Sequence, residues 1–402
     1  MLDAYIYHGL RTPFGRHGGT LAAVRPDDLA AGIIRSVLST SAFPADRIED
    51  VILGCTNQAG EDCRNVARHA ALLAGLPEAV AGQTVNRLCG SGLAAVLDAA
   101  RAISCGEGNL YVAGGVESMT RAPLVLSKAE TAFGREQKLH DSTIGARFAN
   151  KALVAQFGND SMPETADNIA REFDLGRTAS DAFARESQRR YAAAKADGFY
   201  AGELQPVAVP DHKRGETREV DEDEHPRPDA TPESLGKLKP LFAGGVVTAG
   251  NASGINDGAA ALLIGSRDIG REAGAQPIAR IVCGAVAGVS PRLMGLGPVP
   301  AARKALERAG LTLGDIDLIE INEAFAVQVL GCLKGLELSA DDSRVNPNGG
   351  AIAIGHPLGA SGARLALTAA RQLQRSGGRY GLVSLCIGVG QGIALVIERV
   401  PR

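Results

Sequence analysis

The 402-residue sequence lacks the features of several protein classes. Its net charge is only −3, so no basic field favours binding to nucleic acid or to an anionic membrane. The N-terminus MLDAYIYHGLRTPFG has neither the basic nor the apolar region of a signal peptide. No uncharged apolar run reaches the roughly eighteen residues that a membrane span needs. We therefore expect a soluble, cytoplasmic protein that binds neither nucleic acid nor a membrane.

Cysteine pairs with the spacing of metal ligands are also absent. The seven cysteines are odd in number and contain no CxxC pair, which argues against a disulfide framework and a structural zinc site. Free cysteines are most often small buried hydrophobic residues. Cys89 in NRLCGSG and Cys386 in SLCIGVGQG stand apart, because glycines lie close to both. No metal is expected.

The residues that are abundant favour a large layered core. Hydrophobic residues make up 45% of the chain, and 50 residues are glycine. Alanine-rich helical stretches such as LAAVLDAARAI alternate with short β-branched runs such as LYVAGG and YGLVSL. This alternation predicts an α/β fold with largely buried sheets.

Two distant parts of the chain resemble each other. SGLAAVLDAARAISCGEGNLYV from Ser91 aligns with SGARLALTAARQLQRSGGRYGLV from Ser361. The identical pairs include Gly92/Gly362, Leu97/Leu367 and Arg101/Arg371. The shared order of elements predicts two related α/β halves. The charged stretch 121–250 between them is either a solvated surface region or a segment that covers a ligand.

Four side chains are candidates for chemistry. Cys89 follows an extended run and precedes a helix, whose N-terminus would lower the pKa of the thiol. His356 lies in a turn of glycines and prolines at the strand-to-helix edge of the second half, where it is either a turn residue or a base. Cys386 ends a buried strand, and the glycines after it could bind an oxyanion through their N–H groups. Asn322 in INEAFAVQ either caps the next helix or points its amide into a site.

These residue types together favour acyl transfer. Two thiols and an imidazole without metal-ligand spacing can supply one nucleophile, one base and one proton shuttle. If the two halves pack about a pseudo-twofold axis, Cys89 and His356 come from matching edges and could meet.

With these motifs assembled, the chain resembles the thiolase family over its whole length. VNRLCGSG is similar to the family's nucleophile motif, NEAFA to its asparagine motif, NPNGGAIAIGHPLGASGAR to its histidine motif and CIGVGQG to its second-cysteine motif. The resemblance implies a five-layered αβαβα thiolase fold built from two pseudo-symmetric halves. It implies an N-terminal domain at 1–270, with a loop domain inserted at about 121–250, and a C-terminal domain at 271–402. It also implies a homodimer or a homotetramer.

The resemblance assigns a role to each candidate. Cys89 takes the acyl group as a thioester, and His356 activates Cys89 and polarises the acyl carbonyl. Cys386 moves the α-proton in the Claisen step. Asn322 holds a water that, with His356, stabilises the enolate-like oxygen. The backbone N–H groups of Cys89 and Gly388 form a second oxyanion hole, and the reaction is ping-pong.

The resemblance further implies that coenzyme A and acyl-CoA bind as substrates, with no tightly bound cofactor. VTAGNASGINDGAAA is similar to the family's coenzyme A segment. Residues that match coenzyme A contacts are Ser253, Met162, Phe242 and, after a one-residue gap, Arg227. Met294 and Phe325 match positions in the pocket wall.

The substrate branch follows from three further motifs. GEDCRNVARHAALLAGLP, HDSTIGARFAN and DSMPETADNIA resemble the branch of the family that acts on 3-oxoadipyl-CoA (β-ketoadipyl-CoA). The chain departs from that branch at Cys63, His69 and Ala146, and Ala146 either widens the acyl pocket or lies outside it. The alternatives are an acetoacetyl-CoA or broad-chain thiolase, a carrier-protein ketosynthase and a non-catalytic acyl-CoA-binding relative. Cys386 and NEAFA argue against the ketosynthase.

Overall fold

The computed structural model describes residues 1–211 and 215–401, and a ten-stranded mixed sheet runs through it. The N-terminal half of the sheet has the order β4-β3-β5-β10-β1, and the short β2 pairs with β10. Its strands are β1 (Ala4–Arg11), β2 (Gly15–Arg16), β3 (Asp50–Gly54), β4 (Ala81–Val85), β5 (Leu110–Ser118) and β10 (Asn256–Gly265).

The C-terminal half of the sheet repeats this pattern in the order β12-β13-β14-β11. Its strands are β11 (Ala279–Gly288), β12 (Leu318–Ile321), β13 (Tyr380–Ile387) and β14 (Gln391–Arg399). In both halves a parallel pair, β3–β5 or β12–β13, continues into an antiparallel pair, β5–β10 or β13–β14. The halves join where β1 pairs antiparallel with β11, with Ala4 opposite Ile281. The predicted pair of related halves is therefore confirmed.

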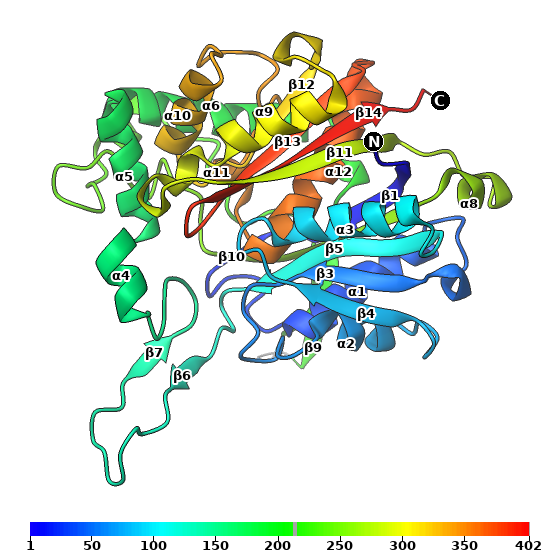
Figure 1. Ribbon diagram of the computed structural model, residues 1–402, viewed down its shortest axis with the longest axis horizontal. Helices are drawn as coiled ribbons and strands as arrows, with labels where there is room; N and C mark the ends of the chain where they lie inside the picture. Colours follow the sequence, from blue (N-terminus) through cyan, green and yellow to red (C-terminus); the bar gives the residue numbers. More distant parts are fainter. Residues whose placement is uncertain (212–214, 402) are drawn as a thin grey trace.

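Helices separate and cover the two halves of the sheet, which gives five layers (Figure 1). The central layer is α3 (Ser91–Cys105) with α12 (Leu358–Ser376), and its apolar side chains pack with residues of β5, β10, β13 and β14. The outer helices are α1 (Pro26–Ser39), α2 (Val66–Leu73) and α8 (Arg267–Glu272) on the N-terminal half, and α9 (Pro298–Ala309) and α10 (Ala326–Gly335) on the C-terminal half. The predicted αβαβα fold is confirmed.

Two glycines of the internal repeat let the central helices approach closely. A Cβ on Gly92 of α3 would lie 2.5 Å from the carbonyl oxygen of Gly359 in α12. A Cβ on Gly362 would lie 2.2 Å from the backbone nitrogen of Leu93. No side chain fits at either position, so the glycine pair Gly92/Gly362 permits the crossing. The segment Leu88–Cys105 has the length and apolar composition of a membrane span, but α3 is a core helix here, and composition alone does not separate the two.

Residues 121–250, which lie between the two halves in the sequence, form mostly helices and strands of their own. They contain β6 (Leu124–Leu126), β7 (Leu139–Asp141), α4 (Lys151–Phe157), α5 (Met162–Phe173), α6 (Arg177–Ala196), η2 (Tyr200–Gly202), β8 (Val207–Asp211), β9 (Glu216–Val220) and α7 (Pro232–Gly236). β6 and β7 extend from the body as an arm (Figure 1). Buried Arg11 on β1 holds this region by bonding Glu203 and Asp223, each at 2.7 Å.

Four short helices complete the described part of the chain. They are η1 (Ala45–Arg47), η3 (Pro291–Leu296), η4 (Leu313–Asp315) and α11 (Ala351–Ile354). α11 directly precedes the loop that leads into α12. The predicted strand-to-helix edge before His356 is therefore a helix-to-helix loop, because the chain makes one turn of helix over AIAI instead of a strand.

Candidate active site

Cys89 lies in a tight turn between β4 and α3. Ser91 Oγ accepts a hydrogen bond from the backbone N–H of Arg87 at 2.8 Å and donates one to the carbonyl of Leu88 at 2.6 Å. Asn86 Oδ1 accepts the backbone N–H of Leu88 at 3.0 Å. Leu88 is held at a φ of 46°, a left-handed conformation that is uncommon outside glycine. The side chains of the motif therefore shape the turn that presents Cys89 at the start of α3.

The surroundings of Cys89 keep its thiol protonated. Burial raises the pKa of the Cys89 thiol to about 11, while the backbone N–H groups of Gly388 and of Cys89 itself act in the opposite direction. The backbone N–H groups thus act in the expected direction, but loss of water around the half-buried thiol outweighs them, and the net shift is opposite to the one expected. Cys89 needs a base when it attacks.

His356 lies between α11 and α12, with only 4% of its surface exposed. Its Nδ1 is 2.6 Å from Ser361 Oγ, and that hydroxyl donates to the carbonyl of Pro357 at 2.9 Å. The hydroxyl has one proton and gives it to Pro357, so Nδ1–H donates to Ser361 and Nε2 carries the lone pair of the ring. Burial, followed by the charge of Arg364, lowers the pKa of His356 to about 3. The ring is therefore neutral, with Nε2 able to accept a proton.

Asn322 lies beside this lone pair. Its Nδ2 is 3.3 Å from His356 Nε2, and its backbone N–H donates to the carbonyl of Ser384. Asn322 does not cap the next helix, because α10 begins after Phe325 and has no side-chain cap. Its buried Oδ1 has no hydrogen-bond partner among the described residues. A buried acceptor without a partner is uncommon and remains available to a polar ligand.

Cys386 lies on β13, one residue before the strand ends, and is 1% exposed. Burial raises the pKa of its thiol well above the ordinary value, and the nearby Cys89 acts in the same direction. The two thiols are thus neighbours that do not both ionise readily. The turn after Cys386 brings the Gly388 N–H to the Cys89 sulfur. The structure therefore pairs Cys89 with Cys386 and Asn322 with His356, and no hydrogen bond joins His356 to Cys89 in the described residues.

Glu117 is the residue that sequence reasoning missed. It ends the apolar strand β5 and is 1% exposed. Its carboxylate accepts N–H groups from Asn57 and Gly359, each at 2.9 Å, and from Thr56 at 3.1 Å. Gly359 lies in the first turn of α12, so one carboxylate joins a loop of the N-terminal half to the helix that follows His356. A lone acid in the run LYVAGGVES was the signal that could have revealed it.

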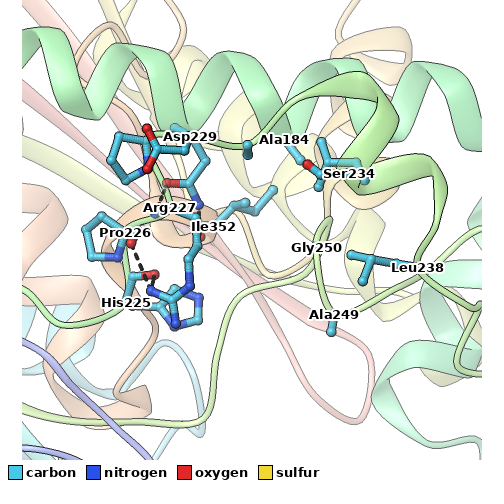
Figure 2. A pocket seen from close by; sticks show the side chains of 14 residues that line it. Ala184, His225, Pro226, Arg227, Asp229, Ser234, Leu238, Ala249, Gly250 and Ile352 are labelled. Atoms are coloured by element: carbon cyan, nitrogen blue, oxygen red, sulfur yellow. Dashed lines mark hydrogen bonds between the residues drawn. The ribbon is translucent and has the colours of Figure 1, made fainter.

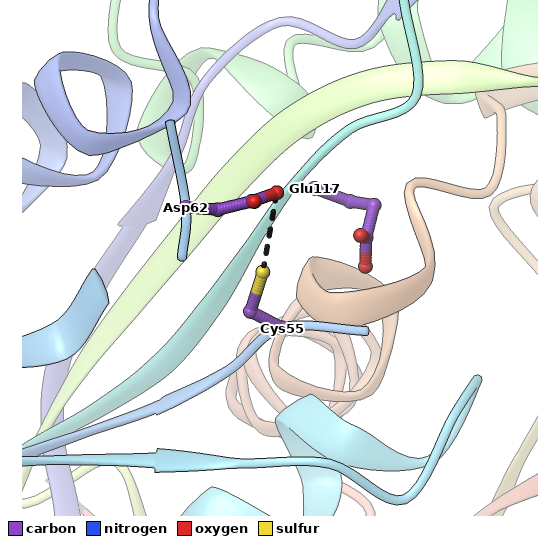
Figure 3. A group of neighbouring side chains, drawn as sticks. All are labelled: Cys55, Asp62 and Glu117. Carbon is purple, nitrogen blue, oxygen red and sulfur yellow. Dashed lines mark hydrogen bonds between the residues drawn. The ribbon is translucent and has the colours of Figure 1, made fainter. Parts of the chain in front are cut away.

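Figure 3 shows Glu117 with Cys55 and Asp62, three residue types that can ligate a metal. The Cys55 thiol donates to the carbonyl of Asn57 at 3.0 Å and lies 3.9 Å from Asp62 Oδ2. Burial raises the pKa of both Cys55 and Asp62. Each group therefore has a protein partner and favours its neutral form, which suits a hydrogen-bonded cluster better than a cation site. The absence of a metal stays a prediction.

Glu117 gives a pH dependence that can be measured. Burial raises the pKa of Glu117 to about 7, so the group loses its charge just below neutral pH. The protonated form cannot accept all three N–H groups, and we expect kcat/KM to fall as pH drops below about 7. Glu117→Gln should lower kcat/KM about tenfold at pH 8 and flatten the profile between about pH 6 and 8. Initial rates across this range test this, with thermal unfolding as the folding control, and an unchanged acid limb in the variant would contradict it.

A cavity of about 630 Å³ lies beside the inserted region (Figure 2). Arg227 stands on one wall, where its Nη1 donates to the carbonyls of His225 and Pro226, each at 2.8 Å. The other wall is mostly small or apolar, with Ser234, Leu235, Leu238, Ala249 and Gly250. The charged stretch is therefore not only a solvated loop, because 225–230 and 234–235 line a cavity. Burial lowers the pKa of His225 to about 4, so a neutral ring faces it.

The other predicted coenzyme A and pocket residues do not line this cavity. The backbone N–H of Ser253 donates to the carbonyl of Ala324 at 2.9 Å, which ties the Ser253 loop to the NEAFA segment. Phe325 and Met294 are buried in one apolar cluster, with Met162 packed against it. Phe242 is 40% exposed. The structure thus groups Met162, Met294 and Phe325 and leaves Phe242 apart.

The three residues at which the chain departs from the motifs of the substrate branch differ in their exposure. Cys63 is half-buried in the loop before α2, and His69 is exposed on α2. Ala146 is exposed between β7 and α4, and no contact places it in the apolar cluster of Met162.

Comparisons with known proteins cover the whole chain. The profile described as "Thiolase, N-terminal domain" matches residues 4–268, and "Thiolase, C-terminal domain" matches 275–399. The chain is 58% identical to the 3-oxoadipyl-CoA/3-oxo-5,6-dehydrosuberyl-CoA thiolase of Escherichia coli (strain K12), over 100% of both chains. It is 56% identical to the beta-ketoadipyl-CoA thiolase of Pseudomonas putida, also over 100% of both.

A solved structure shows the same fold. Human mitochondrial 3-ketoacyl-CoA thiolase in complex with CoA superposes with a TM-score of 0.91. Its sequence is 40% identical, and the match covers 99% of this chain and 98% of that chain. The fold and the order of the motifs therefore agree with those of a protein that binds CoA.

Proposed function

Because this chain belongs to the thiolase family, we propose that it cleaves 3-oxoadipyl-CoA with coenzyme A, giving succinyl-CoA and acetyl-CoA. The observation that carries the proposal is that Asn322 contacts Nε2 of a buried, neutral His356, while the turn after Cys386 brings the Gly388 N–H to the Cys89 sulfur. Full-length identity of 56–58% to relatives named for this substrate supports the choice of acyl group.

In the first half-reaction, Cys89 attacks the C3 carbonyl of the substrate. His356 Nε2 takes the thiol proton as the C–S bond forms. The C2–C3 bond then breaks, which leaves a succinyl thioester on Cys89 and the enolate of acetyl-CoA. Asn322 and His356 stabilise the enolate oxygen, and Cys386 gives its proton to C2. A Cys386 pKa well above the ordinary value suits this step, because the thiol stays protonated until the carbanion needs it.

In the second half-reaction, the Cys386 thiolate takes the proton of an incoming coenzyme A. The coenzyme A sulfur attacks the succinyl thioester, and the N–H groups of Cys89 and Gly388 stabilise the oxyanion. Succinyl-CoA leaves as Cys89 departs, and His356 returns the proton to Cys89. Both thiols and the imidazole are then restored, so the proton count balances.

Coenzyme A itself is proposed to occupy the cavity of Figure 2. Arg227 would pair with the nucleotide phosphates, and Leu235 and Leu238 would pack on the adenine. The pantetheine arm would pass Ser253, which is tied to the NEAFA segment and so leads toward Asn322. The CoA complex of the human relative supports this use of the fold.

We also propose that the protein is a homodimer or a homotetramer. β4 is the outer strand of the sheet, and an outer strand can pair with another chain. The arm exposes large apolar side chains that a partner could cover, namely Leu124, Leu126, Phe133 and Leu139. Sedimentation of the intact protein measures the assembly.

The seven free cysteines favour the reducing cytoplasm as the location of the protein.

Rates with two substrates test the proposed acyl group. We expect kcat/KM for 3-oxoadipyl-CoA to exceed that for acetoacetyl-CoA at least about tenfold, since the relatives named for the former are so similar. Acetoacetyl-CoA winning by a wide margin would favour an acetyl-CoA acetyltransferase instead. If neither compound labels Cys89 with an acyl group, the chain is a non-catalytic acyl-CoA-binding protein.

A further inference from the structure

The turn after Cys386 holds a β-branched residue in a strained conformation. Gly388, Val389 and Gly390 join β13 to β14, and Val389 and Gly390 have φ values of 64° and 82°. Hairpin turns with positive φ at successive residues favour Asn–Gly or Gly–Gly. A β-branched residue in this region is a genuine outlier. Val389 therefore makes the turn less stable than glycine would.

Packing inside the described chain does not compensate for this strain. The Val389 side chain is 56% exposed, although valine gains most from burial. Residues held in strained backbone conformations cluster at functional sites. The side chain thus has a surface that another molecule can cover.

A second left-handed residue lies on the other side of the nucleophile. Leu88 precedes Cys89 at a φ of 46°. Leu88 Cδ1 and Met162 Sδ lie 3.3 and 3.7 Å from the point where a Cβ on Gly388 would be. Gly388 directs its N–H at the Cys89 sulfur. Leu88 therefore lies beside the glycine whose N–H faces the Cys89 sulfur, and Val389 is the next residue of the same turn.

We propose that Val389, with Leu88, forms an apolar wall against the methylene carbons of the acyl group on Cys89 and so favours acyl chains longer than acetyl. The proposal rests on the proposed function, because it needs an acyl group on Cys89. With the acyl oxygen at the N–H groups of Cys89 and Gly388, the rest of the chain leaves from that point. Val389 is the next residue of the turn, and an acetyl group is too short to reach along it.

The variant Val389→Gly tests whether Val389 contacts the acyl chain, when it is assayed with substrates whose acyl groups carry no charge. Acetoacetyl-CoA leaves acetyl on Cys89, whereas 3-oxohexanoyl-CoA leaves butyryl, which has the chain length of succinyl without its charge. We expect kcat/KM for 3-oxohexanoyl-CoA to fall about tenfold and that for acetoacetyl-CoA to change less than about twofold. The midpoint of thermal unfolding should rise, because glycine relieves the strain.

Glu337→Gly is the matched control. Glu337 is exposed, has a φ of 60° and follows the C-cap of α10, where glycine is favoured. This variant should also raise the unfolding midpoint but leave the ratio of the two substrates unchanged. It separates the relief of strain from the loss of a contact with the acyl chain.

Several results would contradict the proposal that Val389 forms a wall against the acyl chain. Equal loss with both substrates would mean that Val389 acts on the nucleophile, and unchanged rates would mean that it contacts no acyl chain. A lower unfolding midpoint or a changed sedimentation coefficient would place Val389 in packing or in a subunit contact. Failure of 3-oxoadipyl-CoA alone would contradict the proposed substrate and not the wall, whereas failure of every acyl-CoA to label Cys89 would overturn both.

Discussion

Cys89→Ala is expected to abolish acyl-enzyme formation and to lower kcat at least about 10,000-fold. The neighbouring thiol of Cys386 is buried, and burial and Cys89 raise its pKa well above the ordinary value. It is therefore a poor substitute for the nucleophile. Incubation with acyl-CoA followed by mass spectrometry of the intact protein measures the loss.

Cys386→Ala is the matched control for this experiment. It should retain some acylation of Cys89, because the first attack needs only His356, yet lose most turnover, because coenzyme A would have no base. Complete and equal loss of acylation in both variants would contradict the separate roles of the two thiols. Thermal unfolding of each variant checks that the buried centre still folds.

His356→Ala is expected to lower kcat/KM about 1,000-fold, the middle of the range for loss of a general base. The Cys89 thiol is neutral at pH 7, since burial raises its pKa to about 11, and only a neighbouring base can activate it. Ser361→Ala, which keeps the imidazole but frees its Nδ1–H, should lose much less, about tenfold. Initial rates with saturating coenzyme A compare the two variants.

The pH profile gives an independent check on His356. Burial and the charge of Arg364 lower its pKa to about 3, so the free enzyme should keep a neutral imidazole down to about pH 4. The acid limb near pH 7 should therefore persist in Ser361→Ala and come from Glu117. A limb that moves in Ser361→Ala but stays in Glu117→Gln would contradict the assignment, and equal loss in the His356 and Ser361 variants would indicate a structural role for both.

The sequence was sufficient to predict features that repeat or that depend on residue type. The match of Ser91 with Ser361 correctly indicated that α3 and α12 are equivalent, because a repeated helix keeps the glycines that its crossing needs. The motifs around Cys89, His356 and Cys386 indicated an acyl-transfer site, because few other residue sets combine a thiol with a base and glycine N–H groups.

The remaining features depend on contacts between distant loops. Glu117 was missed because its partners are backbone N–H groups of Thr56, Asn57 and Gly359, which carry no side-chain signal. The sign of the pKa shift of Cys89 was missed because burial is a property of the folded chain. The placement of the His356 lone pair on Nε2 depends on the Pro357 carbonyl, which only the fold brings to Ser361.

The crossing of α3 and α12 also limits the substitutions that the two halves can accept. Gly92 and Gly362 each exclude a side chain because of the backbone of the other helix, so neither position can accept a larger residue while the opposite helix stays in place. The helix that presents the nucleophile and the helix that follows the base are thus spaced by a mutual constraint. The two related segments differ in chemistry, because a thiol precedes one helix and an imidazole precedes the other. The crossing of the helices, however, keeps the two segments similar in shape.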